Sequence, residues 1–115
     1  MTHYMKLDLR PFDSIAAGRK TIELRLYDEK RRQIKAGDTI VFTNTSAPGR
    51  QLRAAVVKLH FFKSFDELYK ALPLDKCGYL PEELPHASPR DMEGYYSPAQ
   101  QRQWGAVGIE IQLAD

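Results

Sequence analysis

Five short segments with the pattern of β-strands constrain most strongly how this chain folds. They comprise residues 4–9, 21–27, 39–43, 52–62 and 106–113. In each, apolar and polar residues alternate or β-branched and aromatic residues predominate. Glycine and proline turns such as Gly37-Asp38 and Pro48-Gly49 separate them, and no alternation of strands with long helices is present. We therefore predict an α+β fold in which about five to six strands form a small barrel with short flanking helices.

Core residues are predicted on two of these strands. We expect Val56 and Val57 deep inside the long strand 52–62, and Val107, Ile109 and Ile111 on the inward face of the last strand.

The helices between the strands are predicted from their ends. Pro11 suits the first turn of a helix that directs Phe12, Ile15 and Ala16 to the core, and Gly18 ends it, since glycine readily adopts a left-handed conformation. Serines at 64, 88 and 97 have the pattern of helix N-caps, the last two followed by proline.

Length and composition indicate one compact, soluble domain over residues 1–115. The chain is 43% hydrophobic and 28% charged, which suits a single core. No apolar run approaches the ~18 residues of a membrane span, and the first ten residues lack a signal peptide. A single cysteine, Cys77, agrees with a reducing compartment, so we predict a cytoplasmic protein. Cys77 and His86 lack zinc-ligand spacing, and we expect neither a metal nor a cofactor.

Charge is distributed unevenly along the chain. Residues 1–63 hold 13 Lys/Arg against 6 Asp/Glu, whereas residues 64–115 hold 4 against 9. A basic half would favour an anionic partner such as a phosphate chain, unless the two halves interleave in space. The charged connector 27–34 has two interpretations as well: a solvated turn capped by Asp28, or a phosphate-binding patch.

Residues 18–25 contain the strongest candidates for a functional site in the sequence. On the predicted strand, Ile22 and Leu24 face one side, while Thr21, Glu23 and Arg25 face the other. Glu23 and Arg25 can pair with each other at the surface, face water, or hold a ligand between them.

The pattern GxKxxExR, filled by Gly18, Lys20, Glu23 and Arg25, resembles the signature of the ASCH family, a relative of the PUA RNA-binding domains. The turn before residue 39 and the segment 104–109 strengthen the resemblance, which extends over nearly the whole chain. It implies a PUA-like open β-barrel with the motif facing a cleft, and RNA or a modified nucleoside as the partner. Gly18 and Arg19, next to the motif lysine, are then candidates to meet an anion.

Within such relatives, small bacterial enzymes that remove the acetyl group from N(4)-acetylcytidine are thought to use a lysine and a threonine of the motif strand and a later glutamate. Lys20 matches the lysine, but the threonine position is Glu23, and Glu93 is our candidate for the glutamate. One route makes Thr21 the nucleophile. The other, which we prefer, has Glu23 or Glu93 activate a water while Lys20 and Arg25 stabilise the oxyanion.

Two alternatives have no amidohydrolase chemistry. The chain can be a non-catalytic RNA-binding module, for which the absence of the threonine is an argument, or a ribonuclease that uses Lys20 and a hydroxyl. Tyr95 and Tyr96 are either packing residues or a platform on which Tyr96 stacks a base. The sequence does not determine the oligomeric state.

Overall fold

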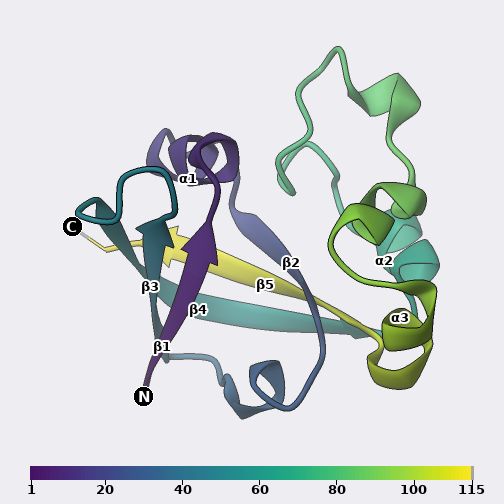
Figure 1. Ribbon diagram of the computed structural model, residues 1–115, viewed down its shortest axis with the longest axis horizontal. Helices are drawn as coiled ribbons and strands as arrows, with labels where there is room; N and C mark the ends of the chain where they lie inside the picture. The colour runs from purple at the N-terminus through teal and green to yellow at the C-terminus, as the bar shows by residue number, and fades with distance from the viewer. Residues whose placement is uncertain (115) are drawn as a thin grey trace.

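The computed structural model describes residues 1–114 (Figure 1). Its strands are β1 (Thr2–Leu7), β2 (Ile22–Leu26), β3 (Thr39–Asn44), β4 (Gln51–Phe62) and β5 (Ala106–Leu113). Its helices are α1 (Leu9–Ala16), η1 (Arg31–Gln33), α2 (Phe65–Ala71), η2 (Leu84–His86), η3 (Pro89–Gly94) and α3 (Pro98–Trp104), of which the three η elements are 3-10 helices. None of these helices is long and apolar enough to cross a membrane.

The strands form one mixed sheet in the order β1-β3-β4-β5-β2. β1 runs parallel to β3, and the other neighbouring strands are antiparallel. The long strand β4 pairs with both β3 and β5, and a β-bulge lies between Val56 and Lys58, where such an extra residue bends a strand. The sheet curves into a half-barrel, which confirms the predicted α+β open barrel with short flanking helices.

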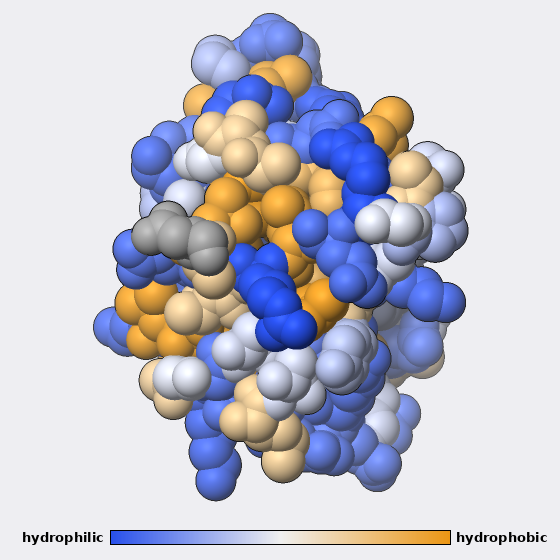
Figure 2. Space-filling model, turned by 90° about the vertical axis from the view of Figure 1, so that its left-hand side faces the viewer, coloured by the Kyte–Doolittle hydropathy of each residue, from blue (hydrophilic) through white to orange (hydrophobic). Residues whose placement is uncertain are grey.

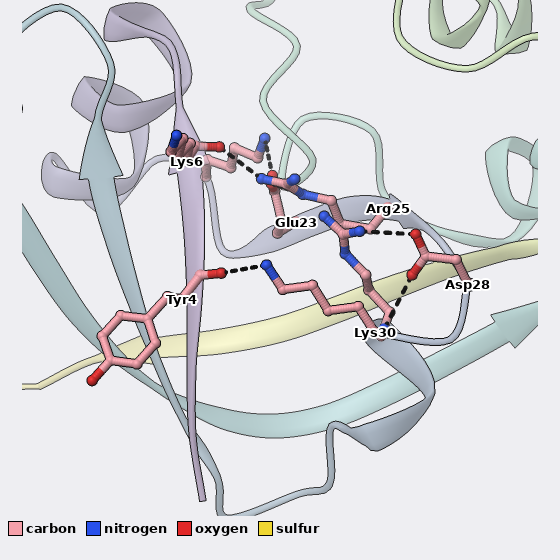
Figure 3. Close-up of polar contacts among 8 residues, drawn as sticks. Tyr4, Lys6, Glu23, Arg25, Asp28 and Lys30 are labelled. Atoms are coloured by element: carbon pink, nitrogen blue, oxygen red, sulfur yellow. Dashed lines mark hydrogen bonds and ion pairs between the residues drawn. The ribbon is translucent and has the colours of Figure 1, made fainter.

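Side chains, rather than backbone hydrogen bonds, connect the two end strands of the sheet. Arg25 Nη2 donates to the Lys6 carbonyl at 3.0 Å, and Lys30 Nζ donates to the Tyr4 carbonyl at 2.8 Å (Figure 3). An unpaired strand edge presents carbonyls of this kind to solvent or to another chain. Two cations from β2 and the segment after it therefore cover part of the free edge of β1.

Two apolar clusters cover opposite faces of the sheet around β2 and β5. The barrel interior contains Met5, Leu7, Phe12, Ile15, Ile34, Ile40, Phe42, Ala54, Val56, Val107, Ile109 and Ile111. The second cluster packs β2 against α2 and the segment before η3, and comprises Ile22, Leu24, Leu26, Phe65, Leu68, Cys77, Met92 and Ala106. In Figure 1, α2 and α3 lie beside the end of the sheet and α1 lies over its upper edge. On the strand that carries the motif, Ile22, Leu24 and Leu26 are consequently covered by the second cluster.

The predicted ends and core positions are mostly confirmed. Val107, Ile109 and Ile111 are buried, and the Ser64 and Ser97 side chains accept hydrogen bonds from the first turns of α2 and α3. Val57, expected inside, is 47% exposed because it follows the buried Val56 on the opposite face, next to the bulge. Ala16 is also exposed, at the last residue of α1.

The surface on the side of β3 and the C-terminal end of β5 is mostly polar. Figure 2 shows a narrow apolar strip in the middle of this face, surrounded by hydrophilic residues. Most of the buried apolar side chains lie in the two clusters.

Candidate functional site

Glu23 is the centre of the candidate site. Its side chain is 4% exposed, and each of its carboxylate oxygens meets a different cation. Lys20 Nζ lies 2.7 Å from Oε1, and Arg25 Nε lies 2.7 Å from Oε2. Figure 3 shows Glu23 and Arg25 turned toward each other from β2. The surface ion pair considered from the sequence is instead an enclosed triad with one carboxylate and two cations.

Local backbone geometry brings Lys20 to this position. Gly18 has φ +80° after α1, as its predicted role as a helix terminator requires, and the backbone N–H groups of Arg19 and Lys20 both donate to the Ser14 carbonyl. Gly78, with φ +112°, lies under the Lys20 alkyl chain: a Cβ there would be 3.2 Å from Lys20 Cδ. The close approach and the left-handed backbone both favour glycine at 78.

The charges of the triad stabilise one another. Burial raises the pKa of Glu23, but the Lys20 and Arg25 cations outweigh it, so the net pKa is lowered and the carboxylate stays ionised. Burial lowers the pKa of Arg25, but Glu23 and Tyr96 raise it by more, so the net pKa lies above the ordinary value. Two cations against one carboxylate leave a formal charge of +1 in a largely desolvated place, which favours an anion or a strong hydrogen-bond acceptor as ligand.

The triad forms one wall of a cavity of about 550 Å³. The end of β1 and the start of α1 form a second wall, with Lys6, Arg10 and Ser14. The segment from α2 to η3 forms the third, and its lining residues include Tyr69, Cys77, Tyr79, Glu83, Asp91, Met92, Tyr95 and Tyr96. At the exposed rim an ion pair between Arg10 and Glu83 joins α1 to this third wall. The basic and acidic halves of the chain therefore meet across the cavity.

Tyrosines dominate the third wall. The Tyr79 hydroxyl donates to Asp91 Oδ2 at 2.7 Å and lies 2.7 Å from the Tyr69 hydroxyl. Burial, with these two neighbours, raises the pKa of Tyr79 far above its ordinary value, so it stays a neutral hydrogen-bonding group. Tyr96 is held parallel to Phe65 at a ring-centroid distance of 6.2 Å, and Tyr95 is 71% exposed. This wall thus offers aromatic faces and fixed hydroxyls to a ligand.

The structure gathers some of the residues selected from the sequence and separates others. Lys20, Glu23, Arg25 and Tyr96 all line the cavity.

The other four residues selected from the sequence do not line the cavity. Gly18, Arg19 and Glu93 are exposed, and Thr21 is half-buried. In η3 it is Asp91 and Met92 that face the cavity. Neither Thr21 nor Glu93 therefore lines the cavity with the triad.

Several lining residues were not selected from the sequence. No motif in the sequence marks Arg10, Tyr69, Tyr79 or Asp91. Tyr79 directly follows Gly78, whose left-handed turn is the one local signal near it. Their convergence depends on contacts between α1 and a segment about 70 residues later.

The charged connector 27–34 contains a turn capped by Asp28, as one interpretation of the sequence expected. Asp28 accepts a hydrogen bond from the Arg31 backbone N–H at 3.1 Å and pairs with the Arg31 guanidinium at 2.9 Å. Within residues 1–114 no three His, Cys, Asp or Glu side chains gather as a metal site requires. The expectation of no metal or cofactor stays a prediction.

The fold and the triad agree with a known protein family. The family model of the ASCH domain matches residues 5–114, and the chain belongs to this family. The family resemblance deduced from GxKxxExR is thereby confirmed.

Two solved structures are similar over the whole chain. The crystal structure of the hypothetical protein PH0355 shares 32% sequence identity with a TM-score of 0.82, covering 99% of this chain and 100% of that one. The solution NMR structure of protein PF0455 from Pyrococcus furiosus shares 31% identity with a TM-score of 0.73, covering 100% of this chain and 99% of that one. No curated protein matches the sequence. The relation to acetylcytidine amidohydrolases is not confirmed by these comparisons.

Proposed function

We propose that this ASCH domain binds RNA by taking one nucleotide or modified nucleoside into the cavity beside Lys20, Glu23 and Arg25. The observation that carries the proposal is the enclosed triad with its excess cation, set in the wall of a tyrosine-lined cavity. The volume of about 550 Å³ lies within the ~300–1,000 Å³ typical of small-molecule sites. Membership of a family related to PUA RNA-binding domains supports RNA as the partner.

The triad retains hydrogen-bonding capacity for such a ligand. Lys20 has three N–H donors and Arg25 has five, of which the contacts to Glu23 and to the Lys6 carbonyl use only a part. These donors suit a phosphate or a base carbonyl, and the free lone pairs of Glu23 suit an exocyclic amino group. The neighbouring Tyr95 and Tyr96 rings suit the face of a base.

Calorimetric titration with cytidine, cytidine 5′-monophosphate and N(4)-acetylcytidine tests the proposal. We expect Lys20→Met to weaken binding of the preferred ligand at least tenfold, because it removes the ammonium and keeps the chain that packs on Gly78. Lys70→Met, at an exposed position of α2, is the matched control and should bind as the wild type does. Equal affinities of wild type and Lys20→Met would overturn the proposal, as would no binding of any of the three at millimolar concentration.

A second candidate is hydrolysis of N(4)-acetylcytidine at the same site. It is favoured by the convergence of Lys20 and Arg25 on one place in the cavity, where both could stabilise an oxyanion. Water would add to the acetyl carbonyl carbon, the bond to N4 would break with proton transfer to that nitrogen, and acetate and cytidine would leave. Of the two bases considered from the sequence, Glu23 lines the cavity and Glu93 does not.

The lowered pKa of Glu23 is an argument for binding over hydrolysis. A general base works best with a pKa near the operating pH, and both cations hold this carboxylate below its ordinary value. Chromatography of N(4)-acetylcytidine incubated with wild type, Lys20→Ala and Glu23→Ala separates the two functions. Cytidine formed by the wild type and lost in both variants would establish the hydrolase. Binding without conversion would leave the RNA-binding module.

A further inference from the structure

A second hollow lies at the opposite end of β2 from Lys20. It is an open groove of about 680 Å³ between the end of β4, the end of α3 and the η1 turn. Its lining residues include the aromatics Tyr27, Phe61 and Trp104 and the cations Arg32, Lys63 and Arg102. We call it the aromatic groove. None of these six residues lines the cavity of the triad.

The aromatic rings and one guanidinium form a connected surface. The Tyr27 and Phe61 ring centroids are 4.8 Å apart, and Arg32 Cζ lies 4.3 Å from the Tyr27 centroid and 5.9 Å from the Trp104 centroid. Phe61 nevertheless remains 55% exposed at the end of β4. The exposed Phe61 ring and the exposed Arg32 guanidinium both contact Tyr27, and each presents a flat surface on which a planar group can stack.

The charge of the groove is unbalanced. Glu67 is the one carboxylate among the described lining residues, and it accepts a hydrogen bond from the backbone N–H of Lys63 at 3.3 Å. Arg32 donates to the Trp104 carbonyl at 3.5 Å. Three cations against one carboxylate leave a formal charge of +2 around the exposed rings, so the groove complements a ligand with both anionic and planar groups.

We propose that the aromatic groove binds unpaired nucleotides of single-stranded RNA, with bases stacked on Phe61 and Arg32 and phosphates paired with Lys63 and Arg102. Stacking platforms combined with cations are how proteins hold single strands without reading their sequence. A duplex is a poorer ligand than a single strand, because its paired and stacked bases do not expose their faces to such a platform. The proposal is independent of the nucleoside chemistry in the cavity, since it concerns a different set of side chains.

The groove and the cavity lie along the same strand, β2, and together form one RNA-binding face. Arg25 in β2 lines the cavity, and Tyr27, which directly follows β2, lines the groove. The Tyr27 backbone N–H donates to the Gly105 carbonyl at 3.0 Å and continues the pairing of β2, and residues two apart in extended chain share a face at a spacing of about 7 Å. Nucleotides that flank one held beside Arg25 could therefore extend into the groove. The groove would supply affinity for the strand, whereas the cavity would select one nucleotide.

The only tryptophan of the sequence lies in this groove, so its fluorescence tests the proposal on the unmodified protein. We expect the twelve-nucleotide oligomer (rU)12 to change Trp104 emission saturably at concentrations at which cytidine, which lacks the phosphates that pair with Lys63 and Arg102, leaves it unchanged. A duplex of the same length should compete at least tenfold less well than the single strand. Binding of (rU)12, detected by anisotropy, without any change in Trp104 emission would overturn the proposal, as would no binding of (rU)12.

Two sets of variants separate stacking from charge. Phe61→Leu keeps an apolar side chain against Tyr27 but removes the aromatic face, and we expect it to weaken (rU)12 binding about tenfold, while Phe61→Trp retains binding. The double variant Lys63→Gln, Arg102→Gln should reduce the slope of log affinity against log salt by about 1.4, from two phosphate contacts. Lys70→Gln, on the exposed side of α2, is the matched control and should keep the wild-type slope. Unchanged affinity in Phe61→Leu together with an unchanged slope in the double variant would also overturn the proposal.

Discussion

The cavity and the aromatic groove lie at opposite ends of the same strand but hold their cations in opposite ways. In the cavity, Lys20 and Arg25 are largely buried and both bind the Glu23 carboxylate. In the groove, Lys63 and Arg102 are exposed and lie beside the exposed ring of Phe61. Charges taken out of water must be paired, so the triad in the cavity wall is coupled to folding stability. Charges left in water cost the fold little and are free to meet a strand.

The sharpest test of this difference is removal of Glu23. We expect Glu23→Ala to lower the free energy of unfolding by about 3–5 kcal/mol, because it leaves two buried cations without their counter-charge. Urea unfolding followed by circular dichroism measures the loss. Glu110→Ala, which removes the partner of His60 in a half-exposed pair, is the control and should cost less than about 1 kcal/mol. A similar loss in both variants would mean that the triad is not a stability element.

A smaller effect is expected from Gly78, which positions Lys20. Gly78→Ala should cost about 1–3 kcal/mol, because φ +112° is unfavourable for alanine, and should also weaken nucleoside binding by displacing the Lys20 chain. Gly37→Ala is the matched control, since Gly37 has φ +94° with no atom within 4 Å of the added Cβ. Gly37→Ala should lose stability and keep its nucleoside affinity. Loss of affinity in both variants would show that the contact with Lys20 is not the cause.

The dependence of the free energy of unfolding on pH should reveal the contribution of the triad. The pKa of Glu23 is lowered in the folded protein, so its ion pairs stabilise the fold fully above the ordinary value of 4.5, and this contribution is lost as pH falls toward the folded pKa. The pKa of Asp38, lowered to about 2 chiefly by a hydrogen bond with His3, adds a second loss in the acid range. Urea unfolding between pH 3 and 7 should give a shallower dependence for Glu23→Gln than for wild type. Identical slopes would contradict the assignment.

The smallest effect is expected in the groove. Lys63→Gln and Arg102→Gln should each change the free energy of unfolding by no more than about 0.5 kcal/mol, because both side chains are exposed and no carboxylate among the described residues pairs with them. Thermal unfolding under the conditions of the RNA titrations measures this. A loss comparable to that of Glu23→Ala would remove the distinction between the two sites.

Elements encoded by neighbouring residues could be predicted from the sequence. Gly18 ends α1 with a positive φ, Ser64 and Ser97 cap their helices, and the last strand places Val107 and Ile109 inward. Each of these features depends on a few adjacent residues. Capping hydrogen bonds, the backbone freedom of glycine and the alternation of side chains along a strand are local effects, so they do not depend on the rest of the chain. The motif of Gly18, Lys20, Glu23 and Arg25 could be recognised for the same reason, because it is a local pattern.

The tertiary structure decided what surrounds that motif. β2 lies at the edge of the sheet, so its alternation alone allowed a solvated Glu23, and only the packing of α1 and the segment 69–96 around it makes the site a buried one. The same packing brings Tyr79 and Asp91 into the cavity and leaves Glu93 outside. Sequence alone therefore determined the strands, the turns and the motif. Burial, and with it the ionised triad and the separation of cavity from groove, required contacts between residues far apart in the chain, which no local pattern encodes.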